Sequence, residues 1–325
     1  MEAGVPAEMQ QLKWQLAIVT GASKGFGASA AVQLATASRS PTHFRLVGRD
    51  AAGLAATRAA IEGLRGGRAT VIEEVVADLA AVAGLGGVAQ QLFAVPTEQE
   101  RAYYKVFFLN NHGSLGPLAN IGGYDGDTLT EMSVAFNLNV TSSCFLTSDL
   151  MQRCQPGGVY AQTGVRKVAI VNVSSLAAVQ PFGSWGIYCA GKAAREMFHR
   201  CLTEEVGKRE ASALPVVRVL NYAPGPLDTD MQREIREGAA VDKATQDFYR
   251  SLKEEGKLVT PADSAGKLVR LLLFESYENG AHVDFYDVSA ESIENTTCCA
   301  CKSCACGKDC MCKEAKAPQC SACEA

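Results

Sequence analysis

The chain has 325 residues, of which 47% are hydrophobic and 20% are charged, with 35 acidic and 31 basic side chains and a net charge of −4. This composition is typical of a folded globular protein and excludes a disordered or collagen-like chain, and it offers no basic surface for nucleic acid or an anionic membrane. No apolar run approaches the roughly 18 residues that span a bilayer, and the first residues lack a secretory signal pattern, so we expect a cytoplasmic protein.

Short β-branched segments alternate with longer Ala-rich or amphipathic segments between Leu16 and Val288. Strands are expected at residues 16–20, 44–48, 69–77, 105–110, 167–173, 216–221 and 281–286. Helices are expected at residues 26–37, 51–64, 82–93, 129–151, 187–207 and 264–275. This alternation predicts an α/β fold, a doubly wound parallel sheet of the Rossmann type with helices on both faces. Ligands of such sheets bind at the carboxyl ends of the strands.

Three regions are expected along the chain. Residues 1–13 form an N-terminal extension, residues 14–288 form one nucleotide-binding domain, and residues 289–325 form a linker with a Cys-rich tail. The tail is set apart because 9 of the 13 Cys lie between Cys298 and Cys323, while Phe, Trp, Tyr, Leu, Ile and Val are absent from residue 298 onward. Such a segment cannot bury an apolar core, so it is either disordered or organised by its sulfurs.

A glycine-rich turn follows the first expected strand and opens an expected helix in the sequence TGASKGFG. Gly21 and Gly25 permit a tight turn and close backbone approach, Gly27 allows close helix–strand packing, and the helix N-terminus offers free N–H groups to a pyrophosphate. An ordinary strand-to-helix loop is the alternative. The residues expected to bind a dinucleotide here are Gly21, Ala22, Ser23, Lys24, Gly25, Phe26 and Gly27.

The end of the second expected strand should select the nucleotide, because an acidic residue there binds a ribose 2′-hydroxyl and a basic residue binds a 2′-phosphate. The residues are Gly48, Arg49 and Asp50. Arg49 and Lys24 supply two positive groups, and a guanidinium can hold a phosphate with two hydrogen bonds. We therefore expect NADP(H), with Arg49 and Asp50 in the cofactor site. In the alternative, Arg49 is a solvated loop charge and Asp50 only caps the next helix.

Two Tyr-x-x-x-Lys pairs are present, Tyr188 with Lys192 and Tyr249 with Lys253. The first pair begins an expected helix and has a serine pair at residues 174–175, just past an expected strand. The second pair lies in a charged segment without such serines. Only the first pair is therefore expected to form a catalytic site.

The chemistry of that pair is proton transfer. Residues four apart share a helix face, so Lys192 is expected beside the Tyr188 hydroxyl, where it favours the ionised phenol and, with an oxidised nicotinamide, lowers its pKa from about 10. Tyr188 then acts as the general acid, and Ser175 holds the substrate carbonyl oxygen as negative charge develops. In the alternative, Tyr188 and Ser175 are ordinary residues at a helix start.

The chain resembles the short-chain dehydrogenase/reductase superfamily, and more closely the sepiapterin reductase family within it. The likeness covers about residues 14 to 288 and is carried by TGASKGFG, NNHGSLG, NVSSLAAVQPF, YCAGKAAREMF, RVLNYAPGPLDTDMQ and GAHVDFYD. It implies NADPH-dependent reduction of the side-chain ketone of a pterin, of the sepiapterin or 6-pyruvoyl-tetrahydropterin type, in tetrahydrobiopterin biosynthesis. It also implies a homodimer built through the helices of Asn139 and Tyr188.

The resemblance also implies roles for individual residues. The catalytic group it implies is Ser175, Tyr188 and Lys192, with Asn139 holding a water of a proton relay. The cofactor residues it adds are Asp78 and Leu79 at the adenine, Asn110 at a strand end, and Leu227, Asp228, Thr229, Asp230, Met231 and Gln232 in a loop over the nicotinamide. The substrate residues it implies are Ser175, Leu176, Tyr188, Gly225 and Asp284.

Asp284 has an independent chemical rationale, because a pterin edge presents an amino group beside a ring N–H and a carboxylate can accept both. The alternative is an aspartate that caps a turn at the end of a strand. Trp185 and Phe182 either line the pocket wall or pack in the core or at a dimer interface. His112 departs from the family pattern, which has a small residue there, and we expect a loop histidine with satisfied hydrogen bonds. Cys189 is expected to be a packed small residue.

The tail, CCACKSCACGKDCMCKEAKAPQCSAC, contains no His. Its Cys-x-Cys and Cys-x-x-Cys steps resemble a metallothionein-type domain and predict clusters that share thiophilic ions such as Zn²⁺ or Cu⁺. A disulfide staple, a ribbon-type zinc site and a redox-labile tail are the alternatives. The expected metal ligands are Cys298, Cys299, Cys301, Cys304, Cys306, Cys310, Cys312, Cys320 and Cys323.

Two further functions stay open for the chain. One is a broad-specificity NADPH carbonyl reductase, and the other is a metal-buffering or NADPH-sensing protein whose reductase domain is idle. The complete Ser175, Tyr188 and Lys192 group favours the pterin ketoreductase.

Overall fold

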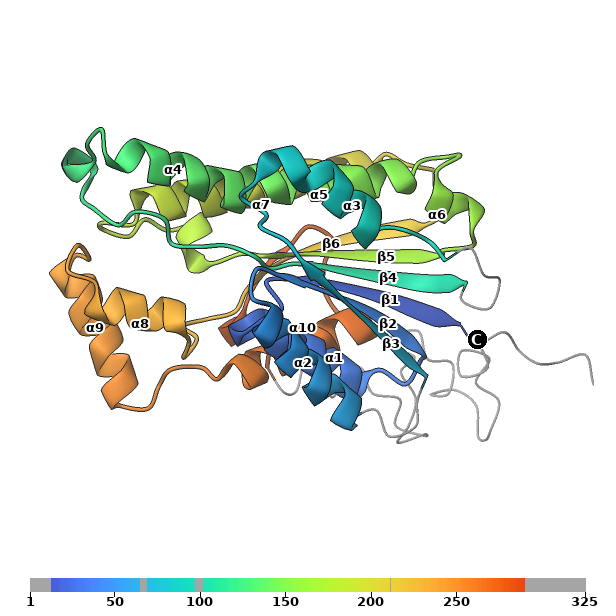
Figure 1. Cartoon of the computed structure of the whole chain (residues 1–325), viewed down its shortest axis with the longest axis horizontal. Coiled ribbons are helices and arrows are strands. Elements are labelled where there is room, and N and C mark those ends of the chain that lie inside the picture. Colours follow the sequence, from blue (N-terminus) through green and yellow to red (C-terminus); the bar gives the residue numbers. More distant parts are fainter. Residues whose placement is uncertain (1–12, 65–68, 97–101, 211, 290–325) are drawn as a thin grey trace, which may run out of the picture.

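The computed structural model describes residues 13–64, 69–96, 102–210 and 212–289, so the Cys-rich tail lies outside the described residues. Within them seven parallel strands form a sheet in the order β3-β2-β1-β4-β5-β6-β7, between two layers of helices (Figure 1). The strands are β1 (Trp14–Thr20), β2 (Thr42–Gly48), β3 (Thr70–Val76), β4 (Tyr103–Asn110), β5 (Lys167–Val173), β6 (Val216–Ala223) and β7 (His282–Asp284). The predicted doubly wound parallel sheet is confirmed.

The helices cover both faces of the sheet. Helices α1, α2 and α10 lie on one face, and α3 to α7 lie on the other (Figure 1). The helices are α1 (Gly25–Ala37), α2 (Ala51–Leu64), α3 (Leu85–Leu92), α4 (Thr128–Phe136), α5 (Ser142–Arg153), α6 (Val159–Gln162), α7 (Gly186–Gly207), α8 (Asp230–Glu237), α9 (Lys243–Glu254) and α10 (Pro261–Phe274).

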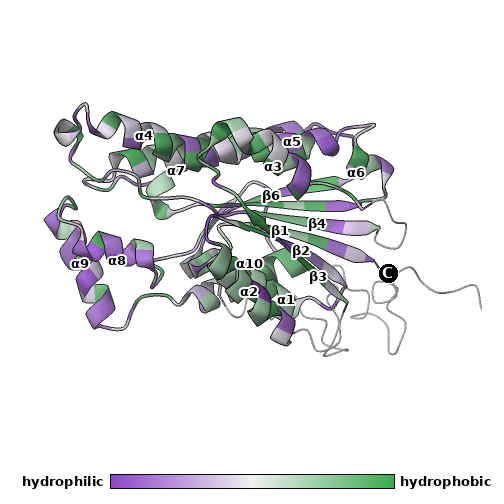
Figure 2. Cartoon of the chain, viewed as in Figure 1, coloured by the Kyte–Doolittle hydropathy of each residue, from purple (hydrophilic) through white to green (hydrophobic). Residues whose placement is uncertain are grey.

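Each central strand is buried on both faces, because successive side chains point to opposite sides of a sheet. In β4, Phe107 joins the core under α1 and α10, while its neighbour Phe108 joins the core under α3 and α5. Figure 2 shows the apolar strands in green between the two helical layers. This two-sided burial explains why these strands appear in the sequence as unbroken apolar runs.

Three helical regions differ from the prediction. The helix expected at 129–151 is divided into α4 and α5 by a π-helical turn, Asn137–Thr141. The helix expected at 82–93 begins as a 3₁₀-helical turn, Val82–Gly84, before α3. Helices α8 and α9, together with the short α6, were not predicted. Helices α8 and α9 are strongly hydrophilic (Figure 2), and they extend beyond one end of the sheet, at the left of Figure 1.

In the part of the chain that the structure describes, no helix is both long and apolar enough to cross a membrane.

Candidate active site

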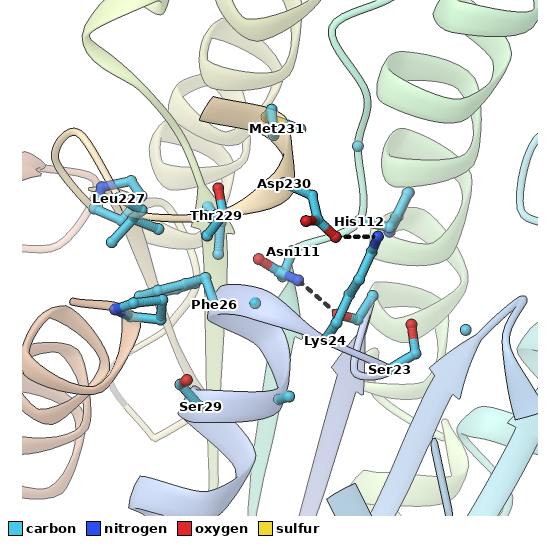
Figure 3. Close-up of a pocket in the computed structure, with 18 of the residues that line it drawn as sticks. Ser23, Lys24, Phe26, Ser29, Asn111, His112, Leu227, Thr229, Asp230 and Met231 are labelled. Carbon is cyan, nitrogen blue, oxygen red and sulfur yellow. Dashed lines mark hydrogen bonds and ion pairs between the residues drawn. The ribbon is translucent and has the colours of Figure 1, made fainter. Parts of the chain in front are cut away.

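A cleft of about 870 Å³ opens at the carboxyl ends of the strands. Its walls come from the glycine turn before α1, from the ends of β2, β3 and β4, from the start of α7, and from the segment that leads into α8 (Figure 3). This is the edge of a parallel sheet at which ligands bind. The predicted residues that line it are Gly21, Ser23, Lys24, Gly25, Phe26, Arg49, Asp50, Leu79, Tyr188, Lys192, Leu227, Asp228, Thr229, Asp230 and Met231.

The glycine turn has the backbone that a dinucleotide phosphate requires. Gly21 and Gly25 adopt φ values of 65° and 58°, a region that side chains disfavour. A Cβ at Gly27 would overlap the Gly21 carbonyl oxygen, so only glycine permits this approach of helix to turn. The N-cap residue of α1, Lys24, makes no side-chain capping bond, so the first N–H groups of the helix are free to bind an anion.

The charged residues at the nucleotide end of the cleft are Arg49 and Asp50 after β2, and the ion pair of Lys24 with Asp230. Arg49 and Asp50 are exposed and line the cleft, and an Asp50 carboxylate oxygen also accepts a bond from the Ala52 N–H at 3.1 Å, as a helix cap does. The Lys24 ammonium lies 2.7 Å from an Asp230 carboxylate oxygen, so it connects the glycine turn to the start of α8 (Figure 3). Arg49 therefore remains available for a phosphate, whereas Lys24 shares its charge with Asp230.

The structure places Asn110 behind the cleft and Asn111 in it. The fully buried Asn110 amide donates to Ser143 Oγ at 2.7 Å, on α5. Asn111 instead lines the cleft and donates to the carbonyl oxygens of Thr20, at 2.8 Å, and Gly21, at 3.2 Å (Figure 3). Asn111 thus fixes the glycine turn, a role that sequence reasoning missed and that the alternation of side chains at the end of β4 could have suggested.

Tyr188 and Ser175 come together at the start of α7. Burial raises the pKa of Tyr188, a hydrogen bond with the Ser175 side chain opposes that rise, and the resulting pKa is about 12. The sequence predicted a lowered pKa through Lys192. Burial is the larger effect among the protein's own groups, so the phenol keeps its proton at neutral pH.

Lys192 follows Tyr188 by one helical turn, as predicted, and its ammonium lies 5.6 Å from the centre of the Tyr188 ring. It also donates to the Val173 carbonyl oxygen at 2.8 Å. Burial, with the nearby Arg195 guanidinium, holds the pKa of Lys192 well below its usual value, although Glu196 opposes this shift. A lysine with a lowered pKa can release and regain a proton closer to neutral pH than a solvated one.

Asn139 lies in the π-helical turn between α4 and α5. Its amide oxygen accepts from the Ser114 N–H and its amide nitrogen donates to the Ser114 carbonyl oxygen, both at 2.9 Å. Gly191 of α7 packs against it, since a Cβ there would lie 3.4 Å from the Asn139 Cβ. Turns of this kind are frequent at functional sites. Asn139 itself does not line the cleft.

His112 is buried at the floor of the cleft with a partner at each ring nitrogen. Nδ1 lies 2.9 Å from Thr20 Oγ1, and Nε2 lies 2.8 Å from Ser142 Oγ. The Ser142 hydroxyl donates to the Leu138 carbonyl oxygen at 2.7 Å, a shorter bond than the 3.2 Å from the Thr20 hydroxyl to the Leu109 carbonyl oxygen. We therefore assign the ring proton to Nε2, which donates to Ser142, and the acceptor role to Nδ1. Burial and the Arg195 charge hold the pKa of His112 well below its usual value. His112 is thus a neutral residue with both nitrogens hydrogen-bonded.

Of the substrate residues implied by the resemblance, Tyr188 lines the cleft, and Ser175, Leu176, Gly225 and Asp284 do not. Gly225 has a φ of 79° and packs against Phe285, and Leu176 is exposed after Ser175. Asp284 ends β7 beside Ala223 of β6, and one of its oxygens accepts from the Tyr286 N–H at 3.0 Å. The capping role that was the alternative for Asp284 is therefore present, and it occupies one of the two carboxylate oxygens.

Aromatic rings pack beside Tyr188. Trp185 stacks on Phe182 with ring centres 5.0 Å apart and on Tyr249 with ring centres 5.8 Å apart, and its edge meets the Tyr188 ring. Tyr249, the tyrosine of the second Tyr-x-x-x-Lys pair, thus packs against Trp185 at the start of α7 and supports the helix that carries Tyr188. Cys189 packs against this cluster, and burial raises the pKa of its thiol, as expected of a packed small residue.

Several predicted residues lie around the cleft without lining it, and several lining residues were missed. The first set is Ala22, Gly27, Asp78, Asn110, Asn139, Ser175, Leu176, Gly225, Gln232 and Asp284. The second set includes Ala28, Ser29, Ala77, Asn111, Gly113, Leu138, Val173, Ser174, Pro224 and Pro261. Most of the missed residues flank a predicted one, so their position in a shared turn or strand end was the available signal.

Comparison with known proteins agrees with this geometry. The family described as short chain dehydrogenase matches residues 15–240. The sepiapterin reductase of Bos taurus is 38% identical over 276 residues, which cover 84% of this chain and 94% of that protein. The sepiapterin reductase of Xenopus tropicalis is 38% identical over 275 residues, covering 84% of this chain and 96% of that protein.

A solved structure shares the fold. The L-sorbose reductase of Gluconobacter frateurii, solved with NADPH and L-sorbose, superposes with a TM-score of 0.62 at 22% identity, covering 84% of this chain and 95% of that one. At this identity the likeness supports the fold alone.

Proposed function

Because this chain belongs to the short-chain dehydrogenase family, with sepiapterin reductases among its relatives, we propose that it reduces the side-chain ketone of a pterin with NADPH. Family membership makes the chain an oxidoreductase that acts on CH–OH or C=O groups with a nicotinamide cofactor. The observation that carries the finer proposal is the buried, protonated Tyr188 beside Ser175 and Lys192 at the edge of the cleft.

The mechanism assigns proton delivery to the protein. When bound, the nicotinamide supplies the hydride. Ser175 orients the ketone oxygen through its hydroxyl, which bonds more strongly as negative charge develops. Tyr188 donates its proton to that oxygen, because its pKa of about 12 keeps it protonated until the oxygen becomes basic. Lys192, with its lowered pKa, then returns a proton to Tyr188, with Asn139 proposed to hold a water of that relay.

We assign the cofactor as NADP(H) from the charges around the nucleotide end of the cleft. Arg49 is exposed there, and Lys24 lies on the adjoining turn, where a 2′-phosphate would share its ammonium with Asp230. The uncapped N-terminus of α1 would hold the pyrophosphate, and Leu79 would contact the adenine. Arg49→Ala is expected to raise KM for NADPH far more than KM for NADH, because only NADPH carries the phosphate.

We assign the pterin ring to Asp284, whose second carboxylate oxygen is not engaged by the cap. The carboxylate would accept hydrogen bonds from the amino group and ring N–H of the pterin. A broad carbonyl reductase is the competing function. Asp284→Asn separates the two, because it should weaken the pterin substrate and spare a small diketone.

The decisive experiment measures NADPH oxidation with sepiapterin for the wild type, Tyr188→Phe and Tyr249→Phe. Loss of the acid is expected to lower kcat roughly 100-fold or more. Tyr249→Phe is the matched control, because it removes the hydroxyl of the other Tyr-x-x-x-Lys pair and keeps the ring that stacks on Trp185. An inactive wild type would exclude this function, and equal activity of the two variants would exclude Tyr188 as its general acid.

We further propose a cytoplasmic homodimer. Leu129 and Val134 of α4, Phe145 of α5 and Met197 of α7 are exposed apolar side chains on helices of the same layer. Burial of such a face is favourable, and it agrees with the interface that the resemblance implies. Light scattering on the purified protein checks the mass.

We also propose that residues 14–288 catalyse the reaction independently of the tail. The cysteines of the tail, Cys298 to Cys323, lie outside the described residues, and we propose that they bind Zn²⁺ or Cu⁺. Within the described residues no three His, Cys, Asp or Glu side chains gather in a metal-binding group, so any bound thiophilic ion is assigned to the tail. The full chain is expected to carry several ions by native mass spectrometry, and a chain ending at Ser289 none. Loss of sepiapterin turnover on that truncation would contradict the independence of the two regions.

A further inference from the structure

Three side chains from separate elements meet beside the catalytic helix. Ser174, just past the end of β5, donates its hydroxyl to a Glu196 carboxylate oxygen at 2.5 Å. The ring nitrogen Nδ1 of His282, the first residue of β7, lies 2.9 and 2.8 Å from the two Glu196 oxygens. Ser174 and Glu196 are buried, while His282 is partly exposed. The Glu196 carboxylate therefore joins β5, α7 and β7.

Each member of this bridge is next to a residue of the proposed site. Ser174 precedes Ser175 in the chain, and Glu196 lies one helical turn after Lys192. His282 and Asp284 are two residues apart in a strand, so their side chains lie on the same face of β7. The bridge thus connects the two ends of the substrate site, namely the strand end that bears Ser175 and the strand that bears Asp284.

The bridge matters because β7 is a short strand at the edge of the sheet. It has three residues, pairs only with Asn221–Ala223 of β6 and forms the edge of the sheet. The segment before β7 also bonds to β6: Gly280 donates its N–H to the Val219 carbonyl oxygen at 2.8 Å, and Asn221 donates its N–H to the Ala281 carbonyl oxygen at 3.0 Å and its side-chain amide to the Gly280 carbonyl oxygen at 3.2 Å. After β7, Lys267 donates to the Phe285 carbonyl oxygen. The His282–Glu196 pair is therefore the side-chain tie between β7 and the catalytic helix in the part of the chain that the structure describes.

The charges favour this tie. Burial raises the pKa of Glu196, but the hydrogen bonds from His282 and Ser174, with the charges of His282 and Arg200, outweigh it and leave the net pKa lowered. The bond to Glu196 raises the pKa of His282 above its usual 6.5; burial opposes that rise, while the charges of Asp284 and Asp287 add to it. Below the raised pKa, the imidazolium attracts both Glu196 and Asp284.

We propose that Glu196 and His282 are positioning residues for the pterin substrate, which hold Asp284 at a fixed spacing from Ser175. The inference rests on the proposed function. A pterin anchored at Asp284 presents its ketone to Tyr188 only if that spacing is kept, and a shift of about 1 Å at a reacting group can cost about 100-fold in rate. A small diketone that does not reach Asp284 has no such requirement.

The experiment compares sepiapterin with a small vicinal diketone for the wild type, Glu196→Gln and His282→Ala. Each variant is expected to lower kcat/KM for sepiapterin about tenfold more than for the diketone, mainly through kcat, because the pterin still binds at Asp284 but its ketone is displaced from Tyr188. His282 is partly exposed on an edge strand, so His282→Ala is expected to fold, and Glu196→Gln keeps the side-chain size. Glu204→Gln, an exposed carboxylate on the same helix, is the matched control for which no such split is expected.

A double-mutant cycle isolates the path through Asp284. In an Asp284→Asn background, His282→Ala should have little further effect on sepiapterin, because the anchor it positions is already lost. In the wild type, the ratio of kcat/KM for sepiapterin to that for the diketone should fall as pH rises through the raised pKa of His282, above 6.5, and this fall should be absent in His282→Ala. The diketone corrects for titration of the catalytic groups shared by both reactions.

Two outcomes overturn the inference while the proposed function stands. One is equal loss for both substrates, which indicates a structural role only, and the other is full additivity of His282→Ala with Asp284→Asn. If the wild type reduces the diketone but not sepiapterin, the proposed function itself fails and the positioning role falls with it.

Discussion

The buried Arg195 side chain donates hydrogen bonds to residues at the carboxyl ends of β4 and β5. We expect Arg195→Met to destabilise the fold strongly. Its guanidinium is fully buried. Nε donates to Asn172 Oδ1 at 3.1 Å, and one terminal nitrogen donates to the His112 carbonyl oxygen at 2.7 Å. The other donates to the Asn110 carbonyl oxygen at 2.6 Å and, more weakly, to Asn110 Oδ1 at 3.3 Å.

The magnitude follows from the acceptors that Met leaves behind. The carbonyl groups of His112 and Asn110 lose a charged donor, and each buried acceptor without a partner costs about 1–3 kcal/mol. Removal of the guanidinium also removes the cost of burying its charge, which offsets part of this loss. We therefore expect the free energy of unfolding to fall by about 3 kcal/mol, a large share of the roughly 5–15 kcal/mol typical of a folded domain.

Urea unfolding followed by circular dichroism gives the measurement. Arg200→Met is the matched control, because Arg200 is exposed on the same helix, and it should change the free energy by less than about 0.5 kcal/mol. Arg195→Lys should lie between the two, since an ammonium keeps the charge but cannot form the planar fork. If Arg195→Met unfolds within about 1 kcal/mol of the wild type, the strand-end carbonyls find other donors and the reasoning is refuted.

Two further predictions concern the glycine turn and the opposite end of the sheet. Gly27→Ala should abolish NADPH binding, because the new Cβ overlaps the Gly21 carbonyl oxygen; fluorescence titration measures this. Gly63→Ala is the control: its Cβ would meet nothing within 4 Å, so this variant should bind NADPH normally and have a slightly more stable helix. Burial raises the pKa of Glu275, but the ammonium groups nearby outweigh this effect, so its pKa lies below the usual 4.5. The ionised carboxylate therefore stabilises the fold above pH 4.5, and this stabilisation is lost as the pH falls through the lowered pKa. The difference in melting temperature between wild type and Glu275→Gln should therefore be largest near neutral pH and vanish in acid; a constant difference would contradict it. The basic partners of Glu275 are Lys105, Lys167 and Arg218.

The strands were predictable because a parallel sheet buries both faces, so each strand is a short apolar run between turns. The π-helical turn at Asn137–Thr141 was not, because a local change in hydrogen-bond register leaves the helical composition unchanged. Helices α8 and α9 are polar on average, but their few apolar residues recur at helical spacing, so the signal for a helix was present in the sequence and was missed. Strand β7 ends at Asp284 rather than at residue 286, because the Asp284 carboxylate caps a 3₁₀-helical turn.

The positions of site residues were predictable where a motif determines the backbone geometry. They were harder to predict where the role of a residue depends on the direction of its side chain. The glycine turn and the one-turn spacing of Tyr188 and Lys192 required only local structure. Asn110 and Asn111 are adjacent, yet one faces α5 and the other the cleft, and that choice depends on the phase of β4 within the sheet. The bridge through Glu196 joins three elements distant in sequence, so no local pattern reveals it.

The direction of the Tyr188 shift bears on the direction of the reaction. A dehydrogenase that oxidises alcohols needs the phenolate as a base, and a reductase of ketones needs the phenol as an acid. Burial raises the pKa of Tyr188 to about 12, so the protein's own groups stabilise the phenol. A phenol is ready to donate when charge appears on the substrate oxygen, whereas a phenolate would first have to form against this burial. The environment of Tyr188 therefore stabilises the protonated form that the proposed ketone reduction requires.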